Sequence, residues 1–522
     1  MSNKISSDIH ELIHAMSKTE KRYFSVFSSR HYSNGDTKYS ALFNFISEQE
    51  VYDEEAIFKH FKGEAFLNQF STTKSRLYDE ILQALDLYHA QKTDEAKILR
   101  IIHSATILYK KGLYNHVEKI LKTGHRIAHK IESHNLILEI NELRKKILET
   151  KNYQSTKGLN VDDLNQENKS LNEFQRVHNL LWEYKSSIYG YLNKNGKPRN
   201  EKDAKHLQVN YENLKLIDIS VLNYKTKHEY FQVIGAYFFS INEHEKCLDI
   251  LLKHIEHLNS NVELKQKHFN LYCSVMTNLI NCYQTLGWHH PVKKHTQSLI
   301  DFIKQIDFKN NKGLKLKTYI NLNSLLLEQA IKQADYDKGL KTINDTTLMI
   351  EQEKDNISPT RKMYFYFQFA KIYFAKGIYK DSLNWINEIL NYKQQERSDI
   401  YNYAQLLHLI IHFELNNKSY LTNALRNTQR NLRKKDALNN FENTIIKELF
   451  KILKEESSFE LEIIYKNALA KLEKLSNDPF EQIAFEFFDI KNWLQSKLTK
   501  KSFEEISRRN YINSLVSESI SA

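Results

Sequence analysis

The chain has 522 residues, with 75 Lys and Arg against 64 Asp and Glu, and a formal net charge of +11. It holds only 12 Gly and 4 Pro, the residues that supply the tight turns of sheets and the glycine-rich loops of nucleotide folds. This composition excludes β-sandwiches, barrels and doubly wound folds and predicts an all-α protein, while a hydrophobic content of 41% excludes wholesale disorder.

The first 16 residues are too polar for a signal peptide, because Asp8, His10, Glu11 and His14 interrupt every apolar run. No stretch approaches the roughly 18 apolar residues of a membrane span. The three cysteines are an odd number in a long chain and indicate no disulfide framework. We therefore expect a cytoplasmic protein with no membrane partner.

Residues 1–92 are predicted to form a helical N-terminal cap. Ser17 and Glu20 have the spacing of a capping box at the start of a helix through Phe27. Further helices are predicted over 39–49, 53–61 and 72–89.

The order of these helices loosely resembles a winged helix-turn-helix. That resemblance implies that the helix after Thr72 enters the major groove and presents Lys74 and Arg76 to DNA. Residues 1–90, however, carry 10 Lys and Arg against 13 Asp and Glu, whereas DNA-binding modules normally present a positive face. A cap that covers the apolar edge of a repeat stack is the favoured interpretation.

From about residue 95 onward, apolar residues recur at helical spacing in segments broken by short polar turns. Within residues 370–390, one apolar stripe precedes Gly377 and a second one follows it. Gly377 occupies the position where a helix end favours a left-handed residue. Two amphipathic helices joined by so short a turn are expected to form an antiparallel hairpin.

This segment resembles a tetratricopeptide repeat. The match is carried by the small residues Ala370 and Ser382, the aromatic residues Tyr373 and Tyr379, and Gly377 between them. Weaker copies of the same frame cover 105–117, 235–248, 280–292, 327–340 and 411–425. The turns at 242, 287, 334, 377 and 418 are 41 to 47 residues apart, longer than the usual repeat of about 34. The resemblance implies a TPR-like α-solenoid of antiparallel helix hairpins.

The predicted domains follow from this pattern. After the cap, 93–150 forms the first hairpin or hairpins, 151–225 a degenerate hairpin with loops, 226–476 the repeats, and 477–522 a C-terminal helix and basic tail. Within 151–225, the polar segment 151–171 is predicted to be a loop or frayed connection. Residues 193–203 are predicted to be an exposed turn.

The resemblance implies that the first helix of each hairpin lines a concave groove that binds peptides. The residues placed in this groove are Gln232, Thr277, Asn281, Gln284, Asn321, Ser324, Glu328 and Lys371. Their amides offer both donors and acceptors, which suits a peptide backbone. On a later helix, Arg426, Arg430 and Arg433 share one face and form a basic patch, interpreted as a solvated surface rather than a nucleic-acid site.

Catalysis, metals and cofactors are not expected. Two histidine groups, His254 with His257 and the cluster 289–295, lack the converging partners of a zinc site. The chain has no nucleophile elbow and no glycine-rich phosphate loop.

We therefore predict an intracellular TPR-like scaffold, not an enzyme, that binds a peptide or protein partner in its groove. The alternative is a transcriptional regulator with a helix-turn-helix-like DNA-binding cap and a TPR-like sensor, although nucleic acid is not the favoured partner. The sequence does not identify the partner.

Overall fold

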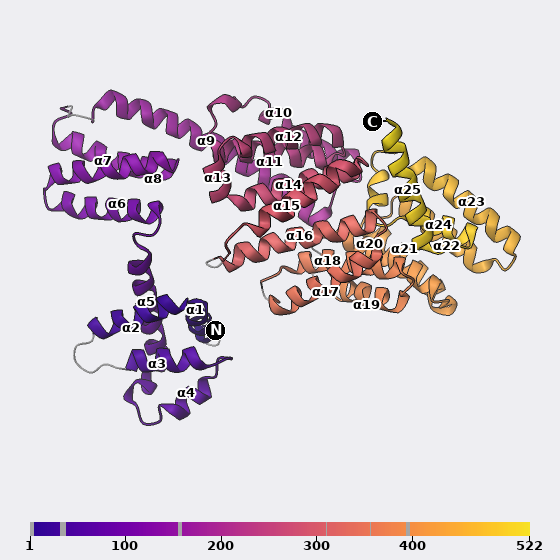
Figure 1. Ribbon diagram of the computed structural model, residues 1–522, viewed down its shortest axis with the longest axis horizontal. Coiled ribbons are helices and arrows are strands. Elements are labelled where there is room, and N and C mark those ends of the chain that lie inside the picture. The colour runs from indigo at the N-terminus through magenta and orange to yellow at the C-terminus, as the bar shows by residue number, and fades with distance from the viewer. Residues whose placement is uncertain are drawn as a thin grey trace. The chain divides into compact units, whose positions relative to one another are not determined.

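The computed structural model describes residues 5–31, 38–154, 159–308, 311–354, 356–392 and 397–521. These residues form 25 α-helices and three short 3-10 helices and contain no β-strand (Figure 1). The chain divides into two compact units, residues 1–175 and residues 176–522. Among the described residues, we find no helix with the length and apolar character that a membrane span requires.

Residues 5–31 and 38–89 of the first unit pack around one apolar cluster that includes Ile13, Leu42, Ile57 and Leu77. The helices are α1 (Ile5–Ala15), α2 (Lys18–His31), α3 (Lys38–Glu48), α4 (Glu54–His60) and α5 (Phe70–His89), with the 3-10 helix η1 (Ala65–Gln69) before α5. The predicted capping box is present: Ser17 N–H donates to Glu20 Oε2 at 2.7 Å, and Glu20 N–H donates to Ser17 Oγ at 3.3 Å.

The rest of the first unit contains longer antiparallel helices around a second apolar cluster. They are α6 (Asp94–Lys110), α7 (Tyr114–Lys130), α8 (His134–Thr150) and the first part of α9 (Val161–Asn195). The prediction of a loop over 151–171 is wrong from Val161 onward. Leu164 and Leu171 are buried, so a few apolar contacts at helical spacing hold this polar segment as a helix.

Residues 176–522 contain the second part of α9 and all later helices. These are α10 (Glu201–Leu214), α11 (Tyr224–Ser240), α12 (His244–Asn259), α13 (Val262–Lys267), α14 (Phe269–Thr285), α15 (His289–Lys304), α16 (Lys312–Lys332), α17 (Tyr336–Gln352), α18 (Pro359–Ala375), α19 (Tyr379–Leu390), α20 (Ser398–Glu414), α21 (Lys418–Lys434), α22 (Asn440–Lys454), α23 (Ser458–Leu475), α24 (Ile490–Thr499) and α25 (Phe503–Ser521). Two 3-10 helices, η2 (Ile219–Val221) and η3 (Gln482–Glu486), connect them.

Consecutive helices from α11 to α23 pair as antiparallel hairpins, except that the short α13 precedes α14. The turns at Asn242, Gly287, Ala334, Gly377 and Asn416 all adopt positive φ. Small residues bring the paired helices close: Ser382 is fully buried, and its hydroxyl donates to the Ala370 carbonyl at 2.7 Å. The predicted all-α solenoid of helix hairpins is therefore confirmed.

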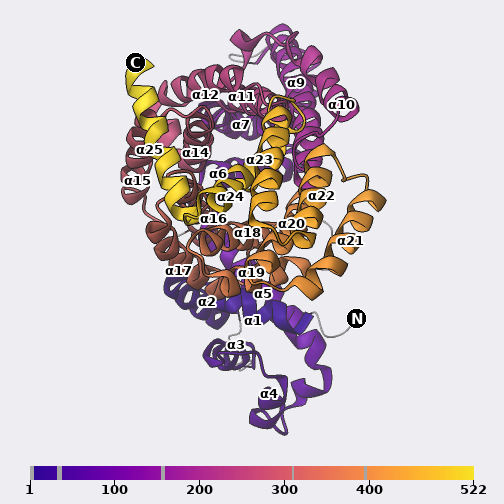
Figure 2. The same ribbon diagram turned by 90° about the vertical axis from the view of Figure 1, so that its right-hand side faces the viewer.

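The first helices of successive hairpins form a continuous inner layer, because α14 contacts α16, α16 contacts α18, and α18 contacts α20. Figure 2 shows α15, α17, α19 and α21 outside this layer. The inner layer consists of α11, α14, α16, α18 and α20.

Candidate binding site on the inner layer

Buried amide side chains line the inner layer. Six of them have a polar atom that is hidden from solvent and finds no hydrogen-bond partner among the described residues. These atoms are Gln232 Oε1, Asn281 Oδ1, Gln284 Oε1, Gln368 Oε1, Asn402 Oδ1 and Gln405 Nε2. They lie on α11, α14, α18 and α20, four of the five inner helices.

An unpaired buried polar group costs about 1–3 kcal/mol, so native structures hold few of them. Gln368 and Gln405 are only 5% and 7% exposed. A run of such groups on neighbouring helices is the unusual feature of the inner layer.

A cavity of about 200 Å³ lies beside the first two of these amides. Its walls come from α9, α11, α12 and α14 and include Leu192, Phe231, Leu251, Gln232 and Asn281. The side chains of Gln232 and Tyr189 are hydrogen-bonded to each other, which leaves Gln232 Oε1 open. The cavity combines apolar walls with a few convergent polar atoms, the usual make-up of a ligand site.

A pair of buried histidines stands next to this cavity. His254 Nε2 lies 2.7 Å from His228 Nδ1, and His254 lines the cavity wall. Burial, together with the charges of Lys185 and His257, lowers the pKa of His228 to about 4. Burial also lowers the pKa of His254 well below its usual value. Both rings are therefore neutral at pH 7.

This pair predicts a loss of stability in mild acid. A histidine in the unfolded chain titrates near pH 6.5. As the pH falls from about 6.5 toward 4, these two histidines therefore bind protons in the unfolded chain but stay neutral in the folded chain. The free energy of unfolding of residues 176–522 should fall across this window. Urea unfolding at pH 7 and pH 5 tests this by tryptophan fluorescence, because all four tryptophans lie in this unit.

The double variant His228→Gln/His254→Gln should lose part of this pH dependence, whereas His206→Gln, at an exposed position of α10, should keep it. An identical pH dependence in the double variant would show that the pair does not titrate as described.

Farther along the inner layer, α18 presents Arg361, Tyr364, Gln368 and Lys371 at helical spacing on one face. Tyr364 Oη donates to Glu328 Oε1 on α16 at 2.5 Å. Lys371 makes no ion pair among the described residues, and its ammonium lies 5.4 Å from the centroid of the Phe367 ring. Burial lowers the pKa of Lys371 to about 7 despite the charge of Glu328.

The predicted groove residues are only partly brought together. Gln232 and Asn281 both line the cavity, and Glu328 accepts the hydrogen bond from Tyr364. Thr277 and Ser324 bond within their own helices, to the carbonyls of Cys273 at 2.9 Å and Ile320 at 2.8 Å. Asn321 is partly exposed on α16. Gln368, Asn402 and Gln405 were not predicted from the sequence, although Gln368 precedes Lys371 by three residues and so shares its face.

The loop between α9 and α10 also reaches the inner layer, so the predicted exposed turn at 193–203 is only partly correct: residues 193–195 and 200–202 are exposed, whereas residues 196–198 are buried. Gly196, Lys197 and Pro198 are buried. Lys197 Nζ lies 2.7 Å from Glu486 and donates to Asn242 Oδ1 at 2.8 Å. Arg199 bonds Tyr403 of α20 and pairs with Glu442 and Glu481, each at 2.9 Å. Lys197 and Arg199 are therefore ion-pair partners and not solvent contacts.

The other predicted contact residues lie elsewhere. The three arginines of the basic patch are exposed on α21, outside the inner layer. In the cap, Arg76 is exposed. Lys74, however, is 6% exposed and pairs with Glu54 Oε2 at 3.0 Å, so it is not presented to a nucleic-acid backbone. The described part of the cap also has no strand that could form a wing.

No protein-family model matches the sequence, and no curated protein matches it. Among solved structures, the chain is similar to the crystal structure of NprR in complex with its cognate peptide NprX. The identity is 15%, the match covers 74% of this chain and 96% of that chain, and the TM-score is 0.38. What this chain binds is therefore inferred from its own contacts.

Proposed function

We propose that residues 176–522 bind an extended peptide segment of a partner protein along the inner layer, without catalysis. The observation that carries this proposal is the set of buried amides with unpaired atoms on α11, α14, α18 and α20. A peptide backbone offers an N–H and a C=O at every residue, and amides can satisfy both. These backbone contacts by themselves do not depend on the partner's side chains.

The cavity between α11 and α14 would take one apolar side chain of such a peptide, because Phe231 and Leu251 form part of its wall. Farther along the layer, Lys371 would pair with an acidic group of the peptide, since its ammonium forms no ion pair with a carboxylate among the described residues. The proposed ligand is therefore an extended peptide with an apolar residue and an acidic group or carboxyl terminus.

The test replaces unpaired amides with apolar residues of similar size, as in Asn281→Leu and Gln368→Met. Because these atoms lack partners in the free protein, the melting temperature should stay the same or rise. Binding of a peptide selected from a random library against the wild-type protein should weaken about fivefold or more for each amide removed, since one hydrogen bond contributes about 1 kcal/mol or more.

Asn423→Leu is the matched control, because Asn423 is an exposed amide on the outer helix α21. It should leave peptide affinity unchanged. A fall in melting temperature with unchanged affinity in the inner-layer variants would assign these amides to folding and remove the proposal.

A further inference from the structure

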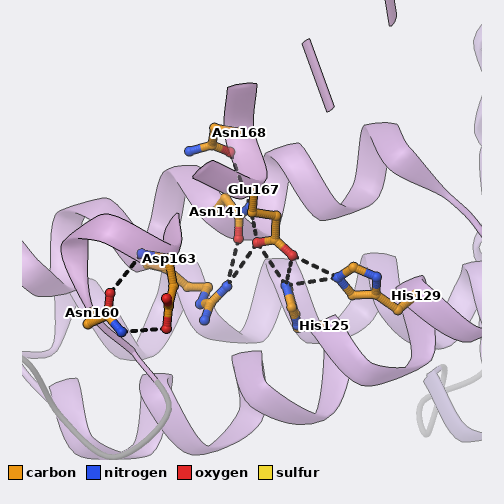
Figure 3. A network of polar contacts seen from close by, with 8 residues as sticks. His125, His129, Asn141, Asn160, Asp163, Glu167 and Asn168 are labelled. Carbon is orange, nitrogen blue, oxygen red and sulfur yellow. Dashed lines mark hydrogen bonds and ion pairs between the residues drawn. The ribbon is translucent and has the colours of Figure 1, made fainter. Parts of the chain in front are cut away.

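Three metal-ligating side chains converge in the first unit, outside the two histidine groups that the sequence singles out. His125 and His129 extend from α7, and Glu167 extends from α9. His125 Nε2 lies 2.9 Å from Glu167 Oε1, and His129 Nε2 lies 2.8 Å from the same oxygen. The two Nε2 atoms are 3.2 Å apart. Figure 3 shows the carboxylate directed at both imidazole rings.

The helices place these groups by ordinary packing. α7 buries Val117, Leu121 and Ala128, and His125 and His129, four residues apart, share the face beside this stripe. On α9, Asp163 N–H donates to Asn160 Oδ1 at 2.7 Å, which caps the helix start. Leu164 and Leu171 are buried, and Glu167 between them is one turn from each.

The carboxylate of Glu167 is held from its other side. Asn141 Nδ2 donates to Glu167 Oε2 at 2.8 Å, and Arg144 Nη1 donates to it at 3.4 Å. Asn141 is fully buried and also donates to Asn168 Oδ1 at 3.1 Å (Figure 3). Outer contacts of this type fix the orientation of metal-binding carboxylates in known sites. They leave Oε1 directed at the histidines.

A cluster held by hydrogen bonds alone would leave the two imidazoles in conflict. Each Nε2 would need its own proton to donate to Glu167, and the two N–H groups would then oppose each other across 3.2 Å. A cation needs no proton on either nitrogen. Tetrahedral ligands at zinc bond lengths of about 2.0–2.1 Å are separated by about 3.3 Å. The separation of the two Nε2 atoms, 3.2 Å, is close to that value, and the two nitrogen–oxygen separations, 2.8 and 2.9 Å, are shorter.

We propose that His125 Nε2, His129 Nε2 and Glu167 Oε1 bind a divalent first-row transition-metal ion, with Zn²⁺ as the ion that the site fits best. Two imidazoles and one carboxylate suit zinc and its neighbours, whereas Ca²⁺ and Mg²⁺ prefer sets of oxygen ligands. The side chains of His125, His129 and Glu167 are 21%, 49% and 22% exposed, so a fourth position is open to water or to a partner's side chain.

A metal ion at this position would link α9 to α7. Because it binds only the folded arrangement, it would stabilise the packing of α9 on the α7–α8 hairpin, by an amount that grows with the logarithm of its free concentration above the dissociation constant. The site lies wholly within residues 1–175 and does not depend on the peptide proposal.

The test uses the untagged full-length protein, stripped of metal with a chelator. Titration with Zn²⁺ in competition with a chromophoric chelator should show one tight equivalent, and Co²⁺ should give the intense visible absorption of a tetrahedral site. Mg²⁺ and Ca²⁺ should not compete. His129→Gln and Glu167→Gln should each lose this equivalent, while His116→Gln, at an exposed position on the same helix, should retain it.

Circular dichroism of each variant separates loss of metal from loss of fold. His129 is half exposed and its glutamine variant is expected to fold, and Glu167→Gln keeps an oxygen for Asn141. Absence of a saturable Zn²⁺ equivalent in the wild-type protein, or equal affinity in the folded His129→Gln and Glu167→Gln variants, would overturn the proposal. So would a site that takes Ca²⁺ in preference to Zn²⁺.

Discussion

Replacing Arg199 with methionine is expected to lower the free energy of unfolding of residues 176–522 by about 3–5 kcal/mol, the cost of removing one partner from a buried ion pair. Glu442 and Glu481 are 2% and 6% exposed, and both depend on the Arg199 guanidinium. Burial already raises the pKa of Glu442, against the lowering by Arg199. Without the arginine, two buried carboxylates would lie close together with no cation to balance their charge.

The same contacts explain why the effect should spread through the unit. Glu481 also accepts the backbone N–H groups of Asn440 and Phe441 at 2.9 and 3.1 Å, at the start of α22. Arg199 therefore joins the loop before α10 to α20, α22 and the segment before η3. Loss of this residue should loosen the last third of the unit from its first helices.

Urea unfolding followed by tryptophan fluorescence measures the effect, since Trp182, Trp288, Trp385 and Trp493 all belong to this unit. Lys205→Met is the matched control, because the Lys205–Glu201 pair is exposed, and exposed pairs contribute about 0–1 kcal/mol. Adding Glu442→Gln and Glu481→Gln to the methionine variant should restore part of the loss. A cost no larger than that of the control would show that Arg199 is solvated.

The hairpin stack was predictable because its signals are local. The spacing of apolar residues within one helix and the residue at one turn position suffice, as at Gly377, where the structure has φ of +74°. The Ser17–Glu20 capping box spans three residues and is found as predicted. The same reasoning placed Ala370 and Ser382 at a close helix–helix contact, which the 2.7 Å hydrogen bond between them confirms.

The errors arise where the partner is distant in sequence. The loop around Lys197 consists of residues typical of a solvent-exposed turn, and its partners Glu442, Glu481 and Glu486 are more than 240 residues away. Periodicity carries no information about such pairs. For the same reason, the less favoured helix-turn-helix alternative could place Lys74 at DNA, whereas Glu54 on another helix neutralises it.

The candidate sites also contain residues that a local pattern predicts and residues that it does not. Gln232 and Asn281 could be predicted because repeat geometry places them on the first helices of hairpins. The pair His125 and His129 has a visible i, i+4 spacing, but a third ligand is needed before such a pair indicates a metal. Glu167 supplies it from the polar segment that was predicted to be a loop. An error in one helix boundary therefore concealed the cluster.

Replacing Gly196 with alanine is expected to cost residues 176–522 about 2–5 kcal/mol. Gly196 has φ of +76°, a conformation that costs an alanine about 1–2 kcal/mol. A Cβ atom there would also lie 2.5 Å from Asp399 Oδ2 and 2.8 Å from Asp399 Cβ, and overpacking costs about 1–3 kcal/mol more. Asp399 cannot easily move away, because Arg397 binds both of its oxygens at 2.9 and 2.8 Å.

Gly287→Ala separates the two costs, because Gly287 has nearly the same φ, +77°, and no atom within 4 Å of the added Cβ. The variant at 196 should therefore unfold at lower urea than the variant at 287, in the same tryptophan-monitored assay. When Asp399→Ala is present, the additional cost at 196 should become smaller, since residues in contact are not additive; the contact with the remaining Cβ of residue 399 at 2.8 Å should keep it above zero. Equal costs at the two glycines would mean that the loop does not lie against α20. The ion pairs of Lys197 and Arg199, which require the loop to reach the inner layer, would then be wrong as well.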